Sequence, residues 1–241
     1  MAELSLKTWL RNRNIHNVVA DTRESLRAIG FVRTCGVIRS RLEDFVFDAR
    51  YGTDTTQINM LEELELDDES RRHGQRYQPT GAYSFRNIMR RLAPPPGSVF
   101  VDYGSGKGRV LMMAALHPFA RVVGIEFSTE LCDIARRNVD DFRSQEAKAA
   151  PIDIVDTDVR KYEYRHDETV FYFFHPFDEA ILRATLDGIR ESLEARPRRA
   201  SLVYYLPKHR ALVEREAFFQ LRETFTIGGY DCMIFDHTPR R

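Results

Sequence analysis

Apolar and polar residues follow two different periods along this chain. Short apolar runs recur between longer segments in which apolar residues are spaced by three and four positions. Runs of the first kind predict buried strands, and the second spacing predicts amphipathic helices. The expected strands are residues 98–101, 121–127, 152–155, 170–174 and 201–206, and the expected helices are residues 109–116, 129–142, 178–193 and 208–217.

Strands that alternate with helices predict an α/β fold, in which right-handed crossovers build a parallel sheet covered by helices on both faces. The C-terminal part differs, because two strand-like runs, 221–227 and 230–236, flank the pair Gly228-Gly229. A Gly-Gly pair between two such runs predicts an antiparallel hairpin. We therefore expect five parallel strands followed by a terminal hairpin.

The N-terminal part of the chain is expected to be helical. Apolar residues in the first 48 positions recur at spacings of three, four and seven, and residues 80–92 show the same helical period. The run Pro94-Pro95-Pro96-Gly97 cannot continue a helix. We therefore divide the chain into a helical N-terminal extension, residues 1–93, which would serve as a lid or a homodimer interface, and a core domain, residues 94–241.

The charge of the 241-residue chain is balanced, with 36 Lys and Arg against 36 Asp and Glu. Nucleic-acid-binding domains usually carry a basic excess, so a nucleic-acid partner is disfavoured. No stretch of the sequence approaches the ~18 apolar residues of a membrane span. The three cysteines form no CxxC pair, which supports neither a disulfide framework nor a zinc site. Composition therefore predicts a soluble cytoplasmic protein.

The overall balance hides blocks of charge. Residues 1–41 hold eight basic and three acidic side chains, residues 52–70 hold seven acids and no Lys or Arg, and residues 71–91 hold six arginines and no acid. Such blocks are typical of solvated faces. The alternative is that the basic N-terminal segment packs on an acidic neighbour or recognises an anionic partner.

A glycine-rich segment is the strongest candidate for a ligand site. The sequence VFVDYGSGKGRVL, residues 99–111, leaves an expected strand through Asp102 and enters an expected helix, with Gly104, Gly106 and Gly108 between them. Glycine permits positive φ angles and lets a ligand approach the backbone closely, because it has no Cβ atom. The segment predicts a ligand-binding turn, and a tight turn without a ligand is the alternative.

Two common phosphate-binding loops do not fit this segment. A P-loop requires G-x-x-x-x-G-K-[ST], but Gly108 follows Lys107 where a Ser or Thr is required, and Val101 stands at the position of the first glycine. The dinucleotide fingerprint G-x-G-x-x-G would place its third glycine at Arg109. A nucleotide-dependent oxidoreductase is therefore disfavoured.

The pattern that does match is D-x-G-x-G-x-G, beginning at Asp102. With an acid at the strand end, it resembles the first motif of class I S-adenosylmethionine-dependent methyltransferases. The resemblance extends over residues 75–238 and implies a Rossmann-like seven-stranded, mostly parallel sheet with an antiparallel terminal hairpin and the strand order 3-2-1-4-5-7-6. It also implies S-adenosyl-L-methionine as the methyl donor and S-adenosyl-L-homocysteine as the product.

Two further acids fall where that family would place them. Glu126 ends the second expected strand, where a carboxylate can accept both hydroxyls of a ribose. After the third strand, Asp158 with Val159 fits the acid and small residue that contact the adenine in the family. Asp156 remains the alternative adenine ligand.

The fourth expected strand leads into Phe174-His175-Pro176-Phe177. Many methyltransferases that act on amino nitrogens carry Asn/Asp-Pro-Pro-Tyr/Phe at this place, so this chain departs from their pattern. A histidine could position an amine or take a proton from a hydroxyl, since its ordinary pKa is about 6.5. A hydrogen bond to the backbone is the structural alternative for His175.

Two segments before the core look unlike linkers: FDARYGTDT at residues 47–55 and HGQRYQPT at residues 73–80. Both are similar to segments of bacterial class I methyltransferases. The Tyr-x-Pro-Thr part also resembles protein-lysine methyltransferases, in which such a segment closes over the methionine end of the cofactor. The resemblance implies that Tyr77 contacts the cofactor or the acceptor. Thr80 would contact the cofactor or, alternatively, cap the helix that follows.

The resemblance thus implies an enzyme that moves a methyl group to a nitrogen or oxygen nucleophile of a small molecule or a protein side chain by in-line displacement, without a metal. A non-catalytic protein that binds the cofactor or a partner on the same fold is the alternative. His175 and Tyr77 are the expected catalytic residues. The expected cofactor contacts are Tyr77, Thr80, Asp102, Gly104, Ser105, Gly106, Gly108, Glu126, Phe127, Asp158 and Val159.

Overall fold

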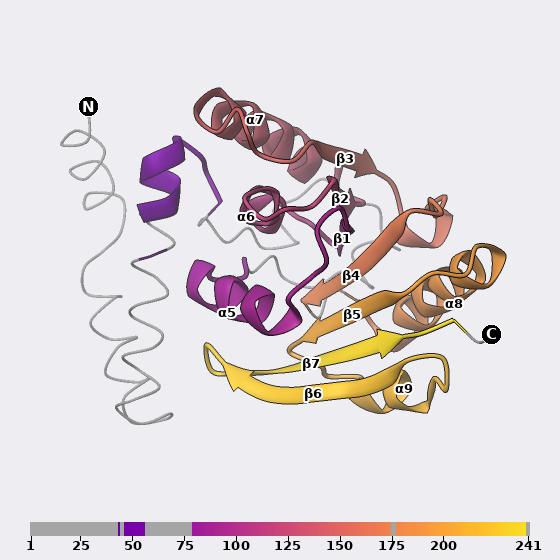
Figure 1. The fold of residues 1–241 in the computed structure, drawn as a ribbon. Coiled ribbons are helices and arrows are strands. Elements are labelled where there is room, and N and C mark those ends of the chain that lie inside the picture. The colour runs from indigo at the N-terminus through magenta and orange to yellow at the C-terminus, as the bar shows by residue number, and fades with distance from the viewer. Residues whose placement is uncertain (1–42, 44–45, 56–78, 175–176, 240–241) are drawn as a thin grey trace.

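The structure is a computed structural model, and it describes residues 43, 46–55, 79–174 and 177–239. The labelled helices are α5 (Ala82–Leu92), α6 (Arg109–Ala115), α7 (Thr129–Gln145), α8 (Glu179–Ala195) and α9 (Arg210–Arg215), and η2 (Val159–Lys161) is a 3-10 turn. The strands are β1 (Val99–Tyr103), β2 (Arg121–Glu126), β3 (Ile152–Asp156), β4 (Glu168–Phe174), β5 (Ala200–Tyr205), β6 (Gln220–Ile227) and β7 (Tyr230–His237). Strands and helices alternate along the core as the sequence predicts (Figure 1).

The strands form one seven-stranded sheet in the order β3-β2-β1-β4-β5-β7-β6. β1 pairs in parallel with β2 and β4, whereas β7 runs antiparallel to both β5 and β6. The hairpin turns at Gly228-Gly229, where Ile227 stands opposite Tyr230. The predicted Rossmann-like sheet with an antiparallel terminal hairpin is confirmed.

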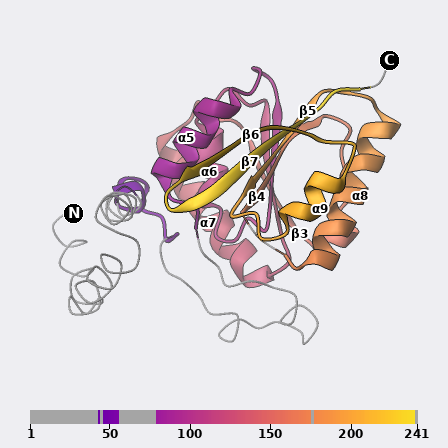
Figure 2. The ribbon, with the colours of Figure 1, turned by 90° about the horizontal axis from the view of Figure 1, so that it is seen from below.

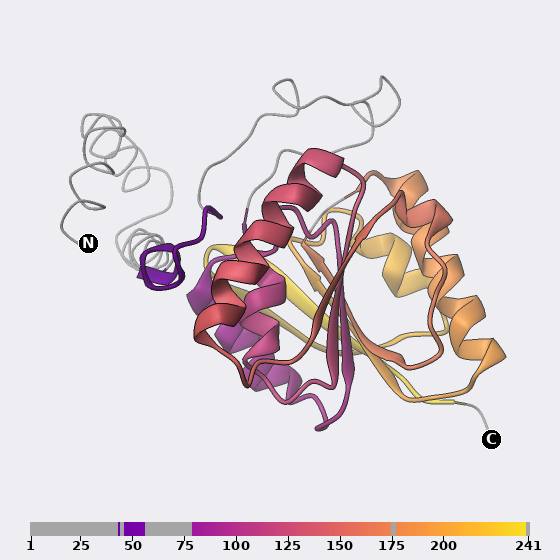
Figure 3. The same ribbon diagram turned by 90° about the horizontal axis from the view of Figure 1, so that it is seen from above.

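Helices cover both faces of the sheet. α5, α6 and α7 lie on one face, and α8 and α9 lie on the other (Figures 2 and 3). Successive side chains of a strand point to opposite faces. Phe100 and Tyr172 therefore join the core under α5–α7, whereas Val101 and Phe171 join the core under α8 and α9. Because both faces are buried, the central strands are continuous apolar runs.

The chain diverges at the carboxyl ends of two neighbouring strands. It leaves β1 for α6 on one face of the sheet and leaves β4 for α8 on the other face (Figure 2). This divergence is a topological switch point, and ligands of open α/β sheets bind in the crevice that it creates. The fold therefore places the candidate site beyond the carboxyl ends of β1 and β4.

The helix before the proline run packs against the sheet. The apolar residues of α5 that share one predicted face, Phe85, Ile88, Met89 and Leu92, are all buried in the core. Ala93 ends the helix in the left-handed conformation, with φ 46°, immediately before the prolines. This packing confirms the predicted helix and its buried face.

Much of the N-terminal extension, residues 1–42 and 56–78, lies outside the described residues. The division of the chain at residue 93, the predicted N-terminal helices and their role as lid or dimer interface therefore stay predictions. Residues 46–51 are helical and lie beside α7 (Figure 1, indigo). There the Tyr51 ring packs edge-on against Phe142, with ring centroids 4.9 Å apart.

No helix in the described part of the chain is long and apolar enough to cross a membrane. Within the same ranges, no three His, Cys, Asp or Glu side chains come together as a group that could hold a metal ion. Cys132 and Cys232 are buried free thiols.

A glycine in β2 makes room for the turn that follows β1. Gly124 pairs with Asp102 in the sheet, and a Cβ atom added to Gly124 would stand 2.4 Å from Leu111 Cδ1 and 2.7 Å from Ser105 Oγ. Leu111 and Ser105 are both buried, so their side chains have little room to move. Glycine is therefore required at position 124 of β2, because the side chains of Leu111 and Ser105 occupy the space of a Cβ atom.

We expect the Gly124→Ala variant to lose about 1–3 kcal/mol of unfolding free energy, because the added methyl group overpacks a filled core. Urea denaturation followed by circular dichroism measures this loss. Gly229→Ala is the control, since no atom lies within 4 Å of a Cβ added there and only the backbone strain at φ 88° acts. A Gly124→Ala protein that unfolds at the wild-type urea concentration would contradict this packing.

Candidate functional site

The turn after β1 is built from three glycines in the left-handed conformation. Gly104, Gly106 and Gly108 have φ angles of 78°, 52° and 82°, which residues with a Cβ atom rarely adopt. The turn is tied to β2, since the backbone N–H groups of Gly104 and Ser105 donate to the Ile125 carbonyl at 2.8 and 3.0 Å. The glycine loop, residues 104–108, thus lies over the end of β2.

Glu126 holds this loop from the last position of β2. Its Oε2 accepts a hydrogen bond from the Gly106 N–H at 2.9 Å, and its Oε1 accepts from the N–H groups of Phe127 and Ser128 at 3.1 and 3.0 Å. Burial raises the pKa of the Glu126 carboxyl, although the three N–H groups act in the opposite direction. A carboxylate has about four acceptor positions, so capacity remains for a ligand hydroxyl.

Asp102 is a second buried acid beside the loop. It is 3% exposed, and its carboxylate makes no hydrogen bond or ion pair with a side chain in the described part of the protein. Burial raises the pKa of Asp102 well above its ordinary value, and the charge of Glu126 adds to the effect. A cation or a hydrogen-bond donor on a ligand would relieve this cost, so Asp102 fits a binding role.

Thr80 reaches the same place through a neighbouring strand. Its hydroxyl shares a buried hydrogen bond of 2.9 Å with the hydroxyl of Tyr172, which pairs with Asp102 in the sheet. The alternative that Thr80 caps α5 is wrong, because the N-cap residue is Gly81 and the Thr80 hydroxyl is bonded to Tyr172. The Thr80 hydroxyl is engaged by β4 instead, and this contact brings Thr80 close to Asp102.

The two acids after β3 differ in their surroundings. Asp158 caps η2 by accepting the Arg160 N–H at 2.8 Å, and its two oxygens pair with Arg160 Nε at 3.0 and 2.9 Å. These bonds to Arg160 lower the pKa of Asp158. Asp156 is exposed at the end of β3, where it stands opposite Glu126. The assignment of either acid to an adenine stays a prediction.

Other predicted site residues are only partly placed. Tyr77 and His175 lie outside the described residues, so their catalytic roles stay predictions. Val159 is buried in the first turn after Asp158. The Ser105 side chain lies against Gly124, and the contact of Ser105 with a cofactor stays a prediction.

Sequence analysis missed the partners of two basic residues in and next to the glycine loop. Lys107 and Arg109 are each 1% exposed, and both contact residues 46–55, which we call the strap. The similarity of the sequence FDARYGTDT to segments of known enzymes was a signal that this part is not a linker. Its contacts span 53 to 61 positions along the chain, however, and a single sequence does not pair such distant residues.

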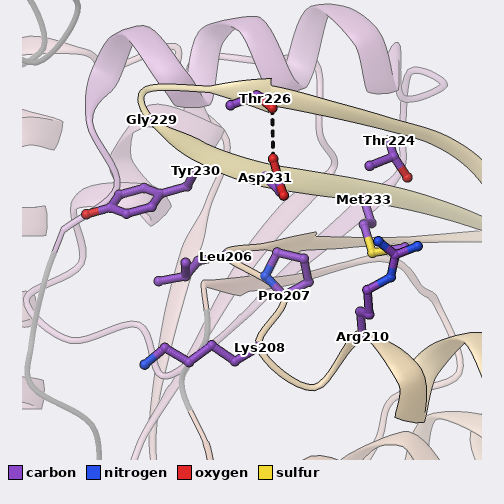
Figure 4. Close-up of a pocket in the computed structure, with 10 residues that line it drawn as sticks. All are labelled: Leu206, Pro207, Lys208, Arg210, Thr224, Thr226, Gly229, Tyr230, Asp231 and Met233. Carbon is purple, nitrogen blue, oxygen red and sulfur yellow. Dashed lines mark hydrogen bonds between the residues drawn. The ribbon is translucent and has the colours of Figure 1, made fainter. Parts of the chain in front are cut away.

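A pocket of about 360 Å³ opens farther along the carboxyl edge of the sheet (Figure 4). Leu206 at its floor has a φ angle of 55°, which is left-handed backbone for a residue with a Cβ atom, and its N–H donates to the Asp231 carbonyl at 2.8 Å. Such strain is typical of functional sites. The pocket is lined by Leu206, Pro207, Lys208, Arg210, Thr224, Thr226, Gly229, Tyr230, Asp231 and Met233.

Aromatic rings connect the end of β4 with this pocket. The Phe174 ring stacks on Tyr205 with centroids 4.8 Å apart, and Tyr205 packs edge-on against Tyr230 at 5.7 Å. Tyr230 lines the pocket, whereas Phe174 immediately precedes His175 in the sequence. The pocket and the switch point thus share one edge and one continuous set of contacts.

The chain is similar to known methyltransferases in part of its sequence and in its fold. Residues 77–173 match the family model described as histone methylation protein DOT1. This match includes the glycine loop, Glu126 and both acids after β3. No curated protein matches the chain by sequence.

Solved structures of methyltransferases superpose on the sheet and its helices. The methyltransferase domain of bacterial CtHen1 covers 65% of this chain and 98% of its own, with 15% identity and a TM-score of 0.52. A SAM-dependent methyltransferase from Aquifex aeolicus covers 65% of this chain and 89% of its own, with 14% identity and a TM-score of 0.51. At this identity the likeness concerns the fold.

We expect Asp102→Asn to raise the melting temperature at neutral pH, because it removes a buried carboxylate. The raised pKa means that the folded protein binds this proton more tightly than the unfolded chain. The unfolding free energy of the wild type therefore decreases as the pH rises above the ordinary Asp pKa of about 3.9, because Asp102 then loses its proton more readily in the unfolded chain. Melting curves between about pH 4 and pH 8 should show a gap between variant and wild type that widens with pH.

The control for this experiment is Asp140→Asn, the same substitution at an exposed position of α7. Its melting temperature should follow the wild-type values at every pH. Parallel curves for Asp102→Asn and wild type would show that the Asp102 carboxylate is not penalised in the folded protein.

Proposed function

We propose that this chain is a class I S-adenosylmethionine-dependent methyltransferase that moves the methyl group to a nitrogen or oxygen nucleophile of a small molecule or a protein side chain. Its fold and the match of residues 77–173 to a methyltransferase family model support this assignment. The observation that carries the proposal is the glycine loop, held by Glu126 and bordered by the buried acid Asp102 at the switch point of the sheet. Each of these groups offers a contact that a different part of the methyl donor requires.

The residues present fit the donor. The backbone of the glycine loop and Asp102 would hold its amino-acid end, which carries an ammonium group. Glu126 would accept the ribose hydroxyls, because its carboxylate retains acceptor capacity beside the loop. Asp158, or Asp156 as the alternative, would accept the adenine amino group. The donor supplies a methyl group that its positively charged sulfur already activates.

The remaining task of the protein is to align the acceptor and exclude water. In-line displacement is fast when the reacting atoms are held in position, so binding geometry carries most of the rate enhancement. A nucleophile that is protonated at neutral pH must also lose a proton. We assign this step to His175, which follows β4 in the sequence, and we place Tyr77 at the same transfer centre.

The pocket at the end of β5 is the proposed site for the part of the acceptor remote from the reacting atom. Lys208 and Arg210 are balanced by Asp231 and by Glu214, whose carboxylate pairs with Arg210 at 2.7 Å. A pocket without an acidic excess favours a polar small molecule over a basic peptide. The matching family is named for histone methylation, which supports a protein acceptor, so both acceptor classes enter the tests.

The cofactor assignment is tested by calorimetric titration of the purified protein with S-adenosylhomocysteine, with NADH as the comparison ligand. We expect micromolar binding of the first alone. Glu126→Gln should weaken it by about tenfold or more, since the loss of a hydrogen bond to a charged group costs about 1.5–3 kcal/mol. Glu130→Gln, on the exposed start of α7, is the matched control and should bind as wild type does. NADH binding, or unchanged affinity in Glu126→Gln, would contradict the assignment.

The acceptor pocket is tested by filling it. Thr224 is an exposed residue of β6 at the pocket wall, and strands tolerate large aromatic side chains, so Thr224→Trp should fold normally. With tritiated methyl donor and a cell extract separated into protein and small-molecule fractions, labelling of the acceptor should fall about fivefold or more, a cost of ~1 kcal/mol.

The affinity of Thr224→Trp for S-adenosylhomocysteine should stay at the wild-type value, because the pocket lies apart from the glycine loop. Thr238→Trp, exposed beyond the end of β7, controls for a surface tryptophan. Full labelling activity in Thr224→Trp would place the acceptor elsewhere.

A further inference from the structure

Two buried basic residues flank Gly108, the last glycine of the loop. Lys107 and Arg109 each have side chains that are only 1% exposed. Arg109 is also the first residue of α6, and the amino end of a helix carries a partial positive charge. Both burial and the helix dipole therefore disfavour the positive charge of Arg109 at this position. The side chains that pair with Arg109 offset this cost, so they help to determine the conformation of the glycine loop.

The partners of Arg109 come from the strap. Arg109 Nε donates to Thr55 Oγ1 at 2.6 Å, and Arg109 Nη2 pairs with Asp48 Oδ2 at 3.2 Å. The guanidinium carbon also lies 5.6 Å from the centre of the Phe47 ring, within the range of a cation–π contact. The strap thus surrounds the first side chain of α6 with an acid, a hydroxyl and an aromatic face.

Asp48 organises the strap around this contact. Its Oδ1 accepts hydrogen bonds from the hydroxyls of Thr53 and Thr55 at 2.7 and 2.6 Å, and its Oδ2 accepts the Thr55 N–H at 3.2 Å. One carboxylate therefore closes the turn of the strap and neutralises Arg109. The isosteric asparagine would retain the size but lose the charge and one acceptor group.

The strap also reaches Lys107. Lys107 Nζ pairs with Asp54 Oδ2 at 3.4 Å. Asn138 of α7 joins the two segments, since its Oδ1 accepts the Asp54 N–H at 2.9 Å and its Nδ2 donates to the Lys107 carbonyl at 3.0 Å. The glycine loop is thus held between β2 on one side and the strap with α7 on the other.

We propose that Asp48 and Asp54 are positioning residues for the methyl donor: by neutralising Arg109 and Lys107, they set the glycine loop in its binding conformation and cancel a positive charge that would repel a cationic ligand. This inference rests on the proposed function. Each acid pairs with one base, so the strap lowers the positive charge that the loop presents to the sulfonium of the donor. Residues 46–55 are therefore part of the cofactor site, although they act on the cofactor indirectly, through the glycine loop.

The first test uses Asp54→Asn. The Asp54 side chain is 52% exposed, so its replacement does not threaten folding. Calorimetry with the donor and with S-adenosylhomocysteine compares a sulfonium with an uncharged sulfur of the same shape. We expect both affinities to fall, and that of the donor by about threefold more, because only the donor carries the extra charge. Equal losses for the two ligands would overturn the electrostatic part of the proposal.

The second test is a double-mutant cycle on the buried pair. Asp48→Asn removes the negative charge that pairs with Arg109, and we expect about a tenfold or larger loss of affinity for S-adenosylhomocysteine. Asp48→Asn with Arg109→Gln removes both charges and should recover part of that loss. Losses that simply add would show that Asp48 does not act through Arg109. Melting temperatures of all variants show which of them are folded.

The matched control is Glu146→Gln, which acts on two other residues of the strap, Arg50 and Tyr51. Glu146 accepts hydrogen bonds from Arg50 and from the Tyr51 hydroxyl, both at 2.9 Å, and has no contact with the glycine loop. We expect its variant to melt earlier but to bind both ligands as wild type does. A loss of affinity equal to that of Asp48→Asn would mean that the strap only stabilises the fold, and it would overturn the proposal. If wild type binds neither ligand, the proposed function itself fails.

Discussion

Buried charge at the carboxyl ends of β1 and β2 is the constraint on which the rest of this structure depends. Two acids, Asp102 and Glu126, and two bases, Lys107 and Arg109, lie in or beside the glycine loop and are almost inaccessible to solvent. Charge in such surroundings requires partners. Glu126 receives three backbone N–H groups, and the bases receive the strap, whereas Asp102 meets no side-chain partner among the described residues. That difference makes Asp102 the group best suited to meet a ligand.

The sheet gives these charges a common place. The glycine loop, α6, α7 and the strap all lie on the face that α5 also covers, while α8 and α9 close the other face (Figure 2). The loop is consequently held by hydrogen bonds from two sides, to β2 on one side and to the strap and Asn138 on the other. Preorganisation of a binding loop lowers the cost of binding. The pocket beyond β5 shares the same edge of the sheet but is lined by none of the residues of the glycine loop.

Local sequence patterns predicted the elements well where backbone geometry or burial determines them. The hairpin at Gly228-Gly229 is confirmed, as is the strand order that the family resemblance implied, and the helix ends differ by a few residues. The last short helix is an example, because the sequence predicts it over residues 208–217 and it spans Arg210–Arg215. Leu206 has left-handed backbone, and its carbonyl accepts a hydrogen bond from the Lys208 N–H. These two residues therefore form a turn before the helix begins. The prediction that Thr80 caps α5 is wrong for a related reason, because its hydroxyl forms a hydrogen bond with the hydroxyl of Tyr172 on β4.

The sequence by itself determined the fold class, because apolar runs alternate with amphipathic segments along the whole core. It also determined the glycine loop and the position of Glu126, because each depends on the residue types of one short segment. A left-handed turn requires glycine, and a buried parallel strand requires an apolar run, wherever they occur. Only the tertiary structure decided that Asp48 neutralises Arg109, that Thr80 meets Tyr172 and that a pocket forms beside Leu206. Those contacts join residues that are distant in the sequence, and the packing of the strap, the helices and the strands, rather than any local preference, brings them together.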